Sequence, residues 1–224
     1  IYGGLNVNPG LNTTGVATIL DNDATPQITL SGPLATSETG GPIVWFSATL
    51  DAASSFTVTV DCATADGTAL AGQDYVTAAL APCFSFAPGT TGPLMVGLTL
   101  LDDTLWEPGG NQTFDLVLSN PANATIATGT ASAAIIDDEA APTMSINSPS
   151  GPEGTTPMNF TVTLTGGVDQ PVTVDYYTAN NSAVAPEDYT AIPAVSTLTI
   201  PAGNLTGTIG VTIIDDNIDE AGQN

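Results

Sequence analysis

The amino-acid sequence predicts an all-β protein made of repeated units, and three observations support this fold class. The 224 residues include 23 Gly and 17 Pro, which separate short apolar runs and so favour many short strands over helices. Within those runs the apolar residues alternate with a period of two, which is typical of half-buried strands. The sequence also repeats itself with a period of roughly 115 residues, which indicates tandem units.

Three landmarks define the repeat. Each occurs twice, at offsets that differ by only a few residues, as expected for true repeats with small loop differences. The matching pairs are Leu101–Glu107 with Ile214–Glu220, Gln73–Tyr75 with Glu187–Tyr189, and Leu20–Asp23 with Ile136–Glu139. One unit is complete and spans residues 26–141.

The complete unit is expected to contain seven antiparallel strands. Turn sequences such as Thr39-Gly40-Gly41-Pro42 and Pro108-Gly109-Gly110 separate them. The expected strands are Gln27–Leu30, Ile43–Leu50, Phe56–Cys62, Phe84–Phe86, Leu94–Leu100, Phe114–Leu118 and Ala131–Ile136. Seven short strands in about 115 residues predict an immunoglobulin-like sandwich, so the chain is expected to form tandem seven-stranded antiparallel β-sandwiches.

Incomplete units are predicted at both ends of the sequence. Residues 1–25 resemble the last two strands of a preceding unit, and residues 142–224 supply a second unit that lacks its own last two strands. The supporting matches are Asn8-Pro9 with Asn120-Pro121, and Val16–Leu20 with Ser132–Ile136. A sandwich without two strands would expose its core and an unpaired sheet edge. Either the sequence is a window from a longer tandem array, or the first strands of one copy complete the last unit of another copy, head to tail.

The charge of the sequence excludes several classes of function. It contains 23 Asp and Glu residues but no Lys, Arg or His, which gives a formal net charge of −23. Nucleic-acid binding is excluded because no cationic side chain can neutralise phosphates. Membrane insertion is not expected, because no apolar run approaches the roughly 18 residues that a span needs. Without His, no Ser-His-Asp or Cys-His pair can form, so the remaining chemistry is that of carboxylates: a hard cation such as Ca²⁺, or a glycosidase-like acid pair.

The placement of the acids favours a cation site. Most of them cluster where strands end, in Asp-Asp-x-x-x-Glu and Asp-Asp-Glu groups at the repeat landmarks. Adjacent like charges repel, so such clusters are unfavourable without a compensating cation, and Ca²⁺ prefers several hard oxygen ligands. A solvated acidic surface is the alternative. An enzyme is not expected, because the acids recur in each unit whereas a catalytic pair would occur once.

With these motifs the sequence resembles the Calx-beta repeat family. In the first unit the matching segments are Ser37-Glu38, Ala71-Gly72-Gln73-Asp74-Tyr75, Phe86–Gly89, Leu101-Asp102-Asp103-x-x-x-Glu107, Phe114–Pro121 and Ile135–Glu139. In the second unit they are Pro152-Glu153-Gly154, Glu187-Asp188-Tyr189, Ile200–Gly203 and Ile214-Asp215-Asp216-x-x-x-Glu220. The resemblance implies a seven-stranded antiparallel sandwich, and in its calcium-binding members Ca²⁺ ions cluster at one end, near the domain junction.

The resemblance also implies a set of Ca²⁺ ligands in each unit. In the first unit they are Glu38, Asp74, Asp102, Asp103, Glu107, Asp137, Asp138 and Glu139. In the second unit they are Glu153, Asp188, Asp215, Asp216 and Glu220. The closing acids of the second site have their counterparts in Asp21 and Asp23 of the preceding partial unit, where Asn22 replaces the middle acid. Ca²⁺ beside the short linkers before Pro26 and Pro142 would stiffen the junctions.

Two kinds of covalent modification are expected. Cys62 and Cys83 invite a disulfide in an extracellular chain, with two buried free thiols as the alternative. Cys62 is in phase with core residues and Cys83 is not, so a bulge after Pro82 would be needed. Asn-x-Ser/Thr sequons mark candidate glycosylation positions, although several arise by accident in a chain this rich in Asn and Thr. They are Asn12, Asn111, Asn123, Asn159, Asn180 and Asn204.

These inferences predict a secreted or cell-surface protein of the bacterial adhesin type, which acts as a calcium-stabilised stalk or fibre subunit. The expected partners are further copies of the same chain or repeat, and surface glycans or proteins. The alternative is an adhesion module that binds a carbohydrate or protein ligand through its loops, and it predicts a groove with exposed aromatic residues on one unit only. A third class, a calcium sensor, predicts a large conformational change at micromolar Ca²⁺, whereas a structural role predicts saturation at millimolar Ca²⁺.

Overall fold

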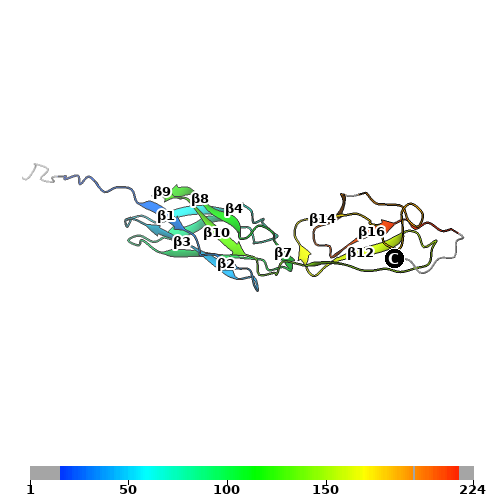
Figure 1. Ribbon diagram of the computed structural model, residues 1–224. Coiled ribbons are helices and arrows are strands. Elements are labelled where there is room, and N and C mark those ends of the chain that lie inside the picture. The colour runs from blue at the N-terminus through cyan, green and yellow to red at the C-terminus, as the bar shows by residue number, and fades with distance from the viewer. Residues whose placement is uncertain (1–15, 194, 217–224) are drawn as a thin grey trace, which may run out of the picture.

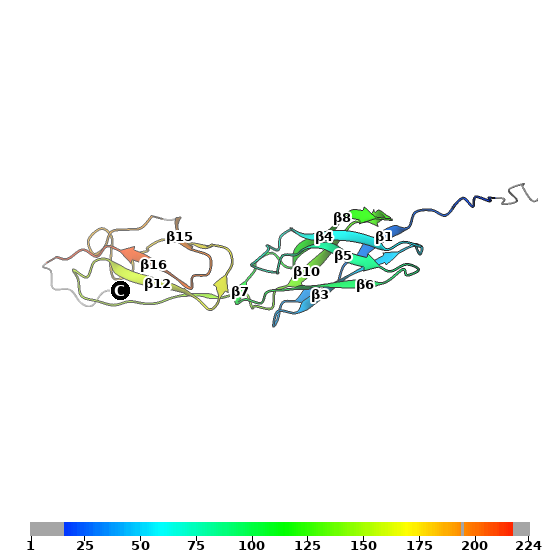
Figure 2. The same ribbon diagram turned by 180° about the vertical axis from the view of Figure 1, so that it is seen from behind.

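The computed structural model describes residues 16–193 and 195–216, and within these ranges the chain forms strands and loops without a helix. Two β-sandwich units lie end to end (Figures 1 and 2), so the all-β prediction is confirmed. No helix in the described ranges is long and apolar enough to cross a membrane.

The first unit is a sandwich of two sheets. One sheet has the strand order β6-β3-β1-β9 and the other has the order β2-β10-β8-β4-β5. The strands of the first sheet are β6 (Leu94–Thr99), β3 (Ile43–Leu50), β1 (Gln27–Ser31) and β9 (Thr125–Thr128). Those of the second sheet are β2 (Thr36–Ser37), β10 (Thr130–Ile136), β8 (Gln112–Ala122), β4 (Val58–Asp66) and β5 (Ala79–Phe86).

The core of the first unit lies between these two sheets. Alternate residues along β3 and β8 point inward, as the period of two predicts. At its centre Phe114 of β8 stacks on Tyr75, with ring centroids 4.0 Å apart, and its ring centroid lies 6.2 Å from that of Phe46 in β3. All three rings are fully buried, so β8 covers Phe46 of the facing sheet and Tyr75 of the loop between β4 and β5.

The observed strands differ from the expected ones in their bounds and in their number. The fourth strand, β5, begins at Ala79 and not at Phe84, and the sixth, β8, spans Gln112–Ala122 and not only Phe114–Leu118. The third expected strand begins at Val58 and not at Phe56, whose side chain is 67 % exposed in the preceding loop and is therefore not part of the core. Three additional short strands form, β2, β9 and β7 (Leu105–Trp106). Strands of two to four residues are too short to show an alternating pattern in the sequence. They form because they pair with segments that are distant along the chain.

Cys62 and Cys83 form a disulfide with an S–S distance of 2.04 Å. The register of β4 against β5 shifts between Val60 and Cys62, so that Val60 faces Phe84 while Cys62 faces Leu80. This irregularity accommodates the phase difference between the two cysteines that the sequence indicates.

The second unit reproduces only part of this arrangement within the described residues. Its sheets are β11-β12-β16 and β14-β15, which correspond to β1-β3-β6 and β4-β5 of the first unit. The strands are β11 (Met144–Ile146), β12 (Met158–Leu164), β16 (Thr206–Val211), β14 (Val172–Tyr176) and β15 (Ser196–Ile200). Its core cluster contains four buried residues against 21 in the first unit, because the described range contains no counterparts of β8, β9 and β10.

A short parallel ladder joins the two units. Strand β13 (Gly167–Val168) of the second unit pairs with β7 of the first, and the Asp169 amide donates to the carbonyl of Trp106 at 3.3 Å. Gly167 permits this approach, because a Cβ at that position would lie 2.5 Å from Leu105 Cδ2. The junction is thus built on the segment between Asp103 and Glu107.

Residues 16–25, part of the segment expected to form the last two strands of a preceding unit, form no strand. Three apolar side chains here are almost fully exposed: Val16 (93 %), Ile19 (94 %) and Leu20 (82 %). The segment extends from the end of the first unit that is remote from the second unit (Figure 1). Asn8-Pro9, the landmark of the other expected strand, lies outside the described residues.

Candidate metal centre

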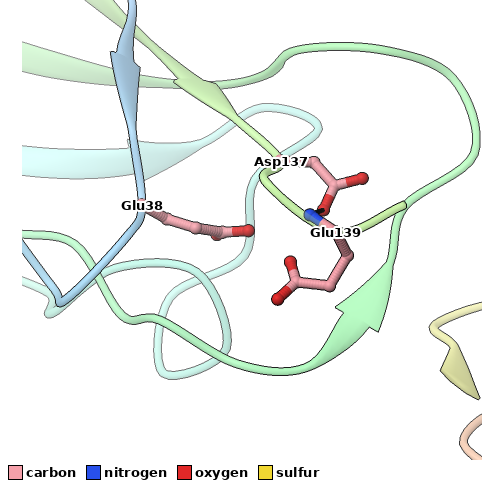
Figure 3. Close-up of side chains that lie close together, drawn as sticks. All are labelled: Glu38, Asp137 and Glu139. Carbon is pink, nitrogen blue, oxygen red and sulfur yellow. Dashed lines mark hydrogen bonds between the residues drawn. The ribbon is translucent and has the colours of Figure 1, made fainter. Parts of the chain in front are cut away.

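The acids of the first unit meet at its junction end, because several strands finish there. Glu38 directly follows β2, and Asp137 and Glu139 directly follow β10. β2 pairs in parallel with β10, with Ser37 opposite Ile136, and the Glu38 amide donates to the Ile136 carbonyl at 3.2 Å. This local pairing places Glu38 beside the acids that follow β10 (Figure 3).

Glu38, Asp137 and Glu139 form the centre of the cluster. One carboxylate oxygen of each lies within 4.8 Å of the others. Glu38 is only 2 % exposed, and its Oε1 has no hydrogen-bond partner among the described residues; the same holds for the buried Oε2 of Glu139. A buried carboxylate oxygen without a partner is unfavourable unless a proton or a cation compensates it.

Two further acids, Asp74 and Glu107, are also buried at this end. Asp74 lies in the loop between β4 and β5, where its Oδ2 accepts a hydrogen bond from the Leu70 amide at 2.6 Å. Glu107 follows β7, and its amide donates to Asp137 Oδ2 at 3.1 Å. Asp103 Oδ1 accepts from the Leu105 amide at 2.7 Å, so the carboxylates fix the backbone of the loop that carries β7.

Asp102 and Asp138 lie at the exposed rim of the cluster. Asp102 Oδ2 accepts a hydrogen bond from the Gly40 amide at 2.8 Å, and Asp138 Oδ2 accepts one from Thr39 Oγ1 at 2.7 Å. Both contacts hold the turn after Glu38. The structure therefore brings all eight acids expected in the first unit to one end, five of them around a buried centre and two at its rim, with Asp103 between them.

Burial and mutual repulsion raise the pKa values of the central acids. Burial, followed by the negative charges of neighbouring carboxylates, raises the pKa of Glu38 to about 7 and that of Glu107 to about 8. Burial, with the hydrogen bond that protonated Glu139 donates to Asp137 second, raises the pKa of Glu139 to about 7. Burial also raises the pKa of Asp74. The chain has no Lys, Arg or His, so only a proton or an external cation can neutralise this site.

The donor set fits a hard cation. All donors are carboxylate oxygens supplied by loops at strand ends, and Ca²⁺ takes six to eight such oxygens in flexible geometry. The unpartnered Oε1 of Glu38 and Oε2 of Glu139 are the observations that favour an ion over a solvated acidic surface. Glu38, Glu107, Asp137 and Glu139 would hold it, with Asp74 and Asp103 beside them.

The structure adds one acid that the sequence comparison missed. Asp169 follows β13 of the second unit, and its charge contributes to the raised pKa of Asp74 in the first unit. Its Oδ1 is buried without a hydrogen-bond partner in the part of the chain that is described, while its Oδ2 accepts from Gln170 at 3.3 Å. The position equivalent to Asp169 in the first unit is Ser55, so comparison of the repeats gives no signal for it.

The acids of the second unit lie at its far end. Asp188 Oδ2 accepts from the Val184 amide at 2.6 Å, which reproduces the contact of Asp74 with Leu70. Glu153 lies with Asp188 along one cavity, and Asp215 lies against Gly154. Asp215 and Asp216 are exposed, and Glu220 lies outside the described residues.

Asp21 and Asp23 join neither group in this chain. They are exposed at the end of the first unit opposite the junction, where Asp21 Oδ1 accepts a hydrogen bond from the Asp23 amide at 3.1 Å. The expected glycosylation positions Asn111, Asn123, Asn159, Asn180 and Asn204 are all exposed and stay predictions, and Asn12 lies outside the described residues.

Fold and site together define a class, namely tandem β-sandwiches with a carboxylate centre at the junction. A family model described as the Calx-beta domain matches residues 21–139 and 137–224. The chain therefore belongs to the Calx-beta domain family, which confirms the resemblance seen in the sequence.

Solved structures of similar fold include the tandem domains CBD12 of CALX1.2 (22 % identity, TM-score 0.45, 86 % of this chain and 76 % of that one). The calcium binding domain CBD12 of CALX1.1 gives 23 % identity, a TM-score of 0.43, and coverage of 84 % and 76 %. The CBD1 domain of Calx in its apo form is 26 % identical over 50 % of this chain and 98 % of that one, with a TM-score of 0.41. No curated protein sequence matches the chain.

Proposed function

We propose that this chain is an extracellular calcium-binding structural protein, in which Ca²⁺ stiffens the junctions of a semi-rigid stalk or fibre. One observation carries the proposal. Two buried carboxylate oxygens, Glu38 Oε1 and Glu139 Oε2, face a centre that no cationic side chain of this sequence can neutralise. Ca²⁺ at this centre would supply the missing charge and the missing ligand contacts.

The position of the centre supports the mechanical part of the proposal. Asp103 and Glu107 flank β7, and β7 is the strand to which β13 of the second unit is paired. An ion held by these acids would fix the loop that carries the junction ladder. Asp169 would add a carboxylate from the second unit, so that one ion would be linked to both units.

An extracellular location is supported by one feature of the chain. The Cys62–Cys83 bond is typical of an oxidising compartment, since cytosolic thiols are kept reduced. Extracellular calcium modules bind Ca²⁺ with Kd values of about 0.1–1 mM, and the proposal places this site in that range. We assign the chain a structural role and no catalytic one, because equivalent acids occur in both units.

The alternative, an adhesion module for a carbohydrate or protein ligand, is favoured by a cavity on the second unit. This cavity of about 720 Å³ is lined in part by Phe160, Tyr177 and Tyr189, and the Tyr177 side chain is exposed. Aromatic side chains with a polar end are typical of ligand-binding grooves. Binding to arrayed glycans would test this alternative.

Thermal unfolding in Ca²⁺ and in a chelator tests the proposed function. Both tryptophans, Trp45 and Trp106, lie in the first unit, so their fluorescence follows that unit. Millimolar Ca²⁺ is expected to raise its Tm by about 5 °C, as for a ligand at roughly ten times its Kd. Glu38→Gln should remove most of this shift, while Glu153→Gln in the second unit should leave it.

No difference in Tm between Ca²⁺ and chelator would contradict the proposal. The Ca²⁺ concentration that produces half of the maximal rise in Tm distinguishes the structural role from a sensor, which would respond at micromolar concentrations. Small-angle scattering in both conditions reports the stiffness of the junction, which should increase in Ca²⁺.

A further inference from the structure

The outer face of the four-stranded sheet in the first unit carries an exposed tryptophan. Trp45 of β3 alternates with the buried Val44 and Phe46, so it points away from the core, and its side chain is 50 % exposed. It is paired with Gly97 of the adjacent strand β6 (Figure 2). A Cβ at residue 97 would lie 3.1 Å from Cζ3 and 3.2 Å from Cη2 of Trp45. The ring therefore packs across the bare backbone of β6 and leaves half of its surface open to solvent.

Two further apolar side chains lie beside this ring. Ile43 also packs over Gly97, since a Cβ there would lie 2.7 Å from Ile43 Cγ2. Met95 lies on β6 diagonally across from Trp45, opposite Ser47. Ile43 and Met95 are both 52 % exposed. Ile43, Trp45 and Met95, here named the tryptophan platform, thus form an exposed apolar patch of the kind that marks a contact surface.

The second unit shows that this fold does not require the platform. Asn159 of β12 is paired with Gly210 of β16 and takes the repeat position of Trp45. The other two platform positions are occupied by Pro157 and Thr208. The same pair of strands therefore forms with an amide in place of the indole ring, and the need for Trp45 is not one of folding.

The sheet that carries the platform contains no charged residue. None of the 23 acids of the sequence lies in β1, β3, β6 or β9, whereas the other sheet of the same unit contains Asp61, Asp66 and Asp115. The net charge of −23 repels an anionic ligand, and a cationic ligand would be attracted to the acid clusters instead. The charge distribution thus matches the platform to a neutral ligand.

The polar groups around the platform are hydroxyls. Ser31, Ser47 and Thr99 occupy neighbouring outward positions on β1, β3 and β6. Within residues 16–193 and 195–216, neither these hydroxyl groups nor Nε1–H of Trp45 forms a hydrogen bond, so they are available to a ligand. A pyranose ring has an apolar face of C–H groups, which matches the electron-rich face of an indole, and a rim of hydroxyls that can pair with these groups.

We propose that the tryptophan platform binds a neutral glycan, with one pyranose ring stacked on Trp45 between Ile43 and Met95. Three half-exposed side chains offer far less apolar area than the roughly 800 Å² that each partner buries in a stable protein–protein interface, which favours a sugar over a protein. The site is separate from the carboxylate centre and from the cavity on the second unit. The proposal therefore does not rest on the calcium role.

A glycan array that contains neutral and sialylated oligosaccharides tests the proposal, followed by calorimetric titration with the strongest neutral binder. We expect neutral glycans alone to bind, and to bind equally in Ca²⁺ and in chelator. Trp45→Asn introduces the residue that the second unit has at this position, so the sheet is retained, and the affinity should fall about tenfold or more. Trp45→Phe, which keeps a smaller ring, should retain part of the binding.

Two control variants should bind as the wild-type chain does. Leu34→Asp removes an apolar side chain that is 89 % exposed in the loop between β1 and β2, outside the sheet. Tyr177→Ala alters the cavity on the second unit. A third variant, Trp106→Phe, leaves Trp45 as the sole tryptophan, so its emission should change saturably with the glycan, with the same half-saturation as in calorimetry.

Several results would overturn the proposal. These are no binding of any neutral glycan, binding that Trp45→Asn leaves unchanged, or an emission of Trp45 that the bound glycan does not alter. Loss of binding in Tyr177→Ala alone would assign the glycan to the cavity, and loss in chelator would assign it to the carboxylate centre. Self-association that Trp45→Asn abolishes, without glycan binding, would assign the platform to a second copy of the chain. Failure of Ca²⁺ to raise the Tm of the first unit would contradict the calcium role and leave glycan binding standing.

Discussion

The two units have the same local motifs but differ in how completely they are closed. Asp74 and Asp188 accept the same backbone hydrogen bond, from Leu70 and Val184, at the same distance of 2.6 Å. The aspartate–tyrosine motif thus forms its loop in both units. The first unit adds β8 and β10 over its core, and the described second unit does not. Local hydrogen bonds therefore determine the conformation of these loops, whereas strands that are distant along the chain bury the core.

The same difference between the units determines how deeply their acidic residues are buried. In the first unit β10 delivers Asp137 and Glu139 next to Glu38, and all three come together in a buried site. In the second unit the equivalent strand is missing from the described residues, and Glu153 and Asp215 are exposed. The buried carboxylate centre of the first unit thus depends on the acids that follow β10.

The largest expected effect comes from removing the ring that closes the first unit. Phe114→Ala leaves a cavity between the two sheets and should lower the free energy of unfolding of the first unit by about 3–5 kcal/mol. The matched change Phe160→Ala, on the open side of the second unit, should cost only about 1 kcal/mol, because that ring is half-buried already. Urea unfolding followed by tryptophan fluorescence and by circular dichroism measures both.

Equal losses of stability in the two variants would contradict the contrast between a closed and an open sandwich. The fluorescence transition provides a control, because both tryptophans lie in the first unit and Phe160→Ala should leave it unchanged.

The second prediction concerns pH. The folded pKa values of Glu38 and Glu107 lie at about 7 and about 8, above the ordinary value of 4.5. Between these values the folded first unit binds more protons than the unfolded chain, so its stability falls as pH rises. In chelator the Tm of the first unit should therefore fall by on the order of 5–10 °C between about pH 5 and pH 8.5.

Ca²⁺ should reverse this trend, because the ion binds the ionised carboxylates and its affinity rises with pH. Scanning fluorimetry across the pH series, with and without Ca²⁺, provides the measurement. A Tm in chelator that rises over this range would show that the acids are not buried together.

The smallest expected effect concerns the junction. Asp169→Asn removes the negative charge that the second unit places near Asp74, and should weaken Ca²⁺ binding by up to about tenfold, as for a residue that supports a metal site. Asp175→Asn is the matched control, since Asp175 lies in the same unit and its carboxylate accepts from Thr197 instead. Calorimetric titration of both variants separates a junction effect from a change in net charge.

Unchanged affinity in Asp169→Asn would confine the site to the first unit. Tighter binding would indicate that the unpartnered oxygen of Asp169 repels its neighbours and is not compensated by the ion.

Much of the first unit could be predicted from the sequence, because its strands alternate clearly. Ile43–Leu50 was expected as a strand and is observed with the same bounds as β3. The acids were expected at one end because they follow strand ends, and Glu38 and Asp137 do meet there. Both inferences depend on patterns local to the chain.

What could not be predicted depends on contacts between distant segments. Strand β7 consists of two residues and exists only through its pairing with β13. Asp169 gains its place near Asp74 through the same pairing, and no repeat position indicates it. Phe56 alternates in phase with Val58, but the strand begins only at Val58, so phase alone places Phe56 wrongly in the core.

Equilibrium dialysis with Ca²⁺ tests most directly whether the carboxylate centre of the first unit is a metal site. The wild-type chain should bind Ca²⁺ saturably at millimolar concentration, Glu38→Gln should lose the ions of the first unit, and Leu34→Asp should bind as wild type does. Saturable binding that Glu38→Gln leaves unchanged, or no saturable binding by the wild-type chain, would contradict the account.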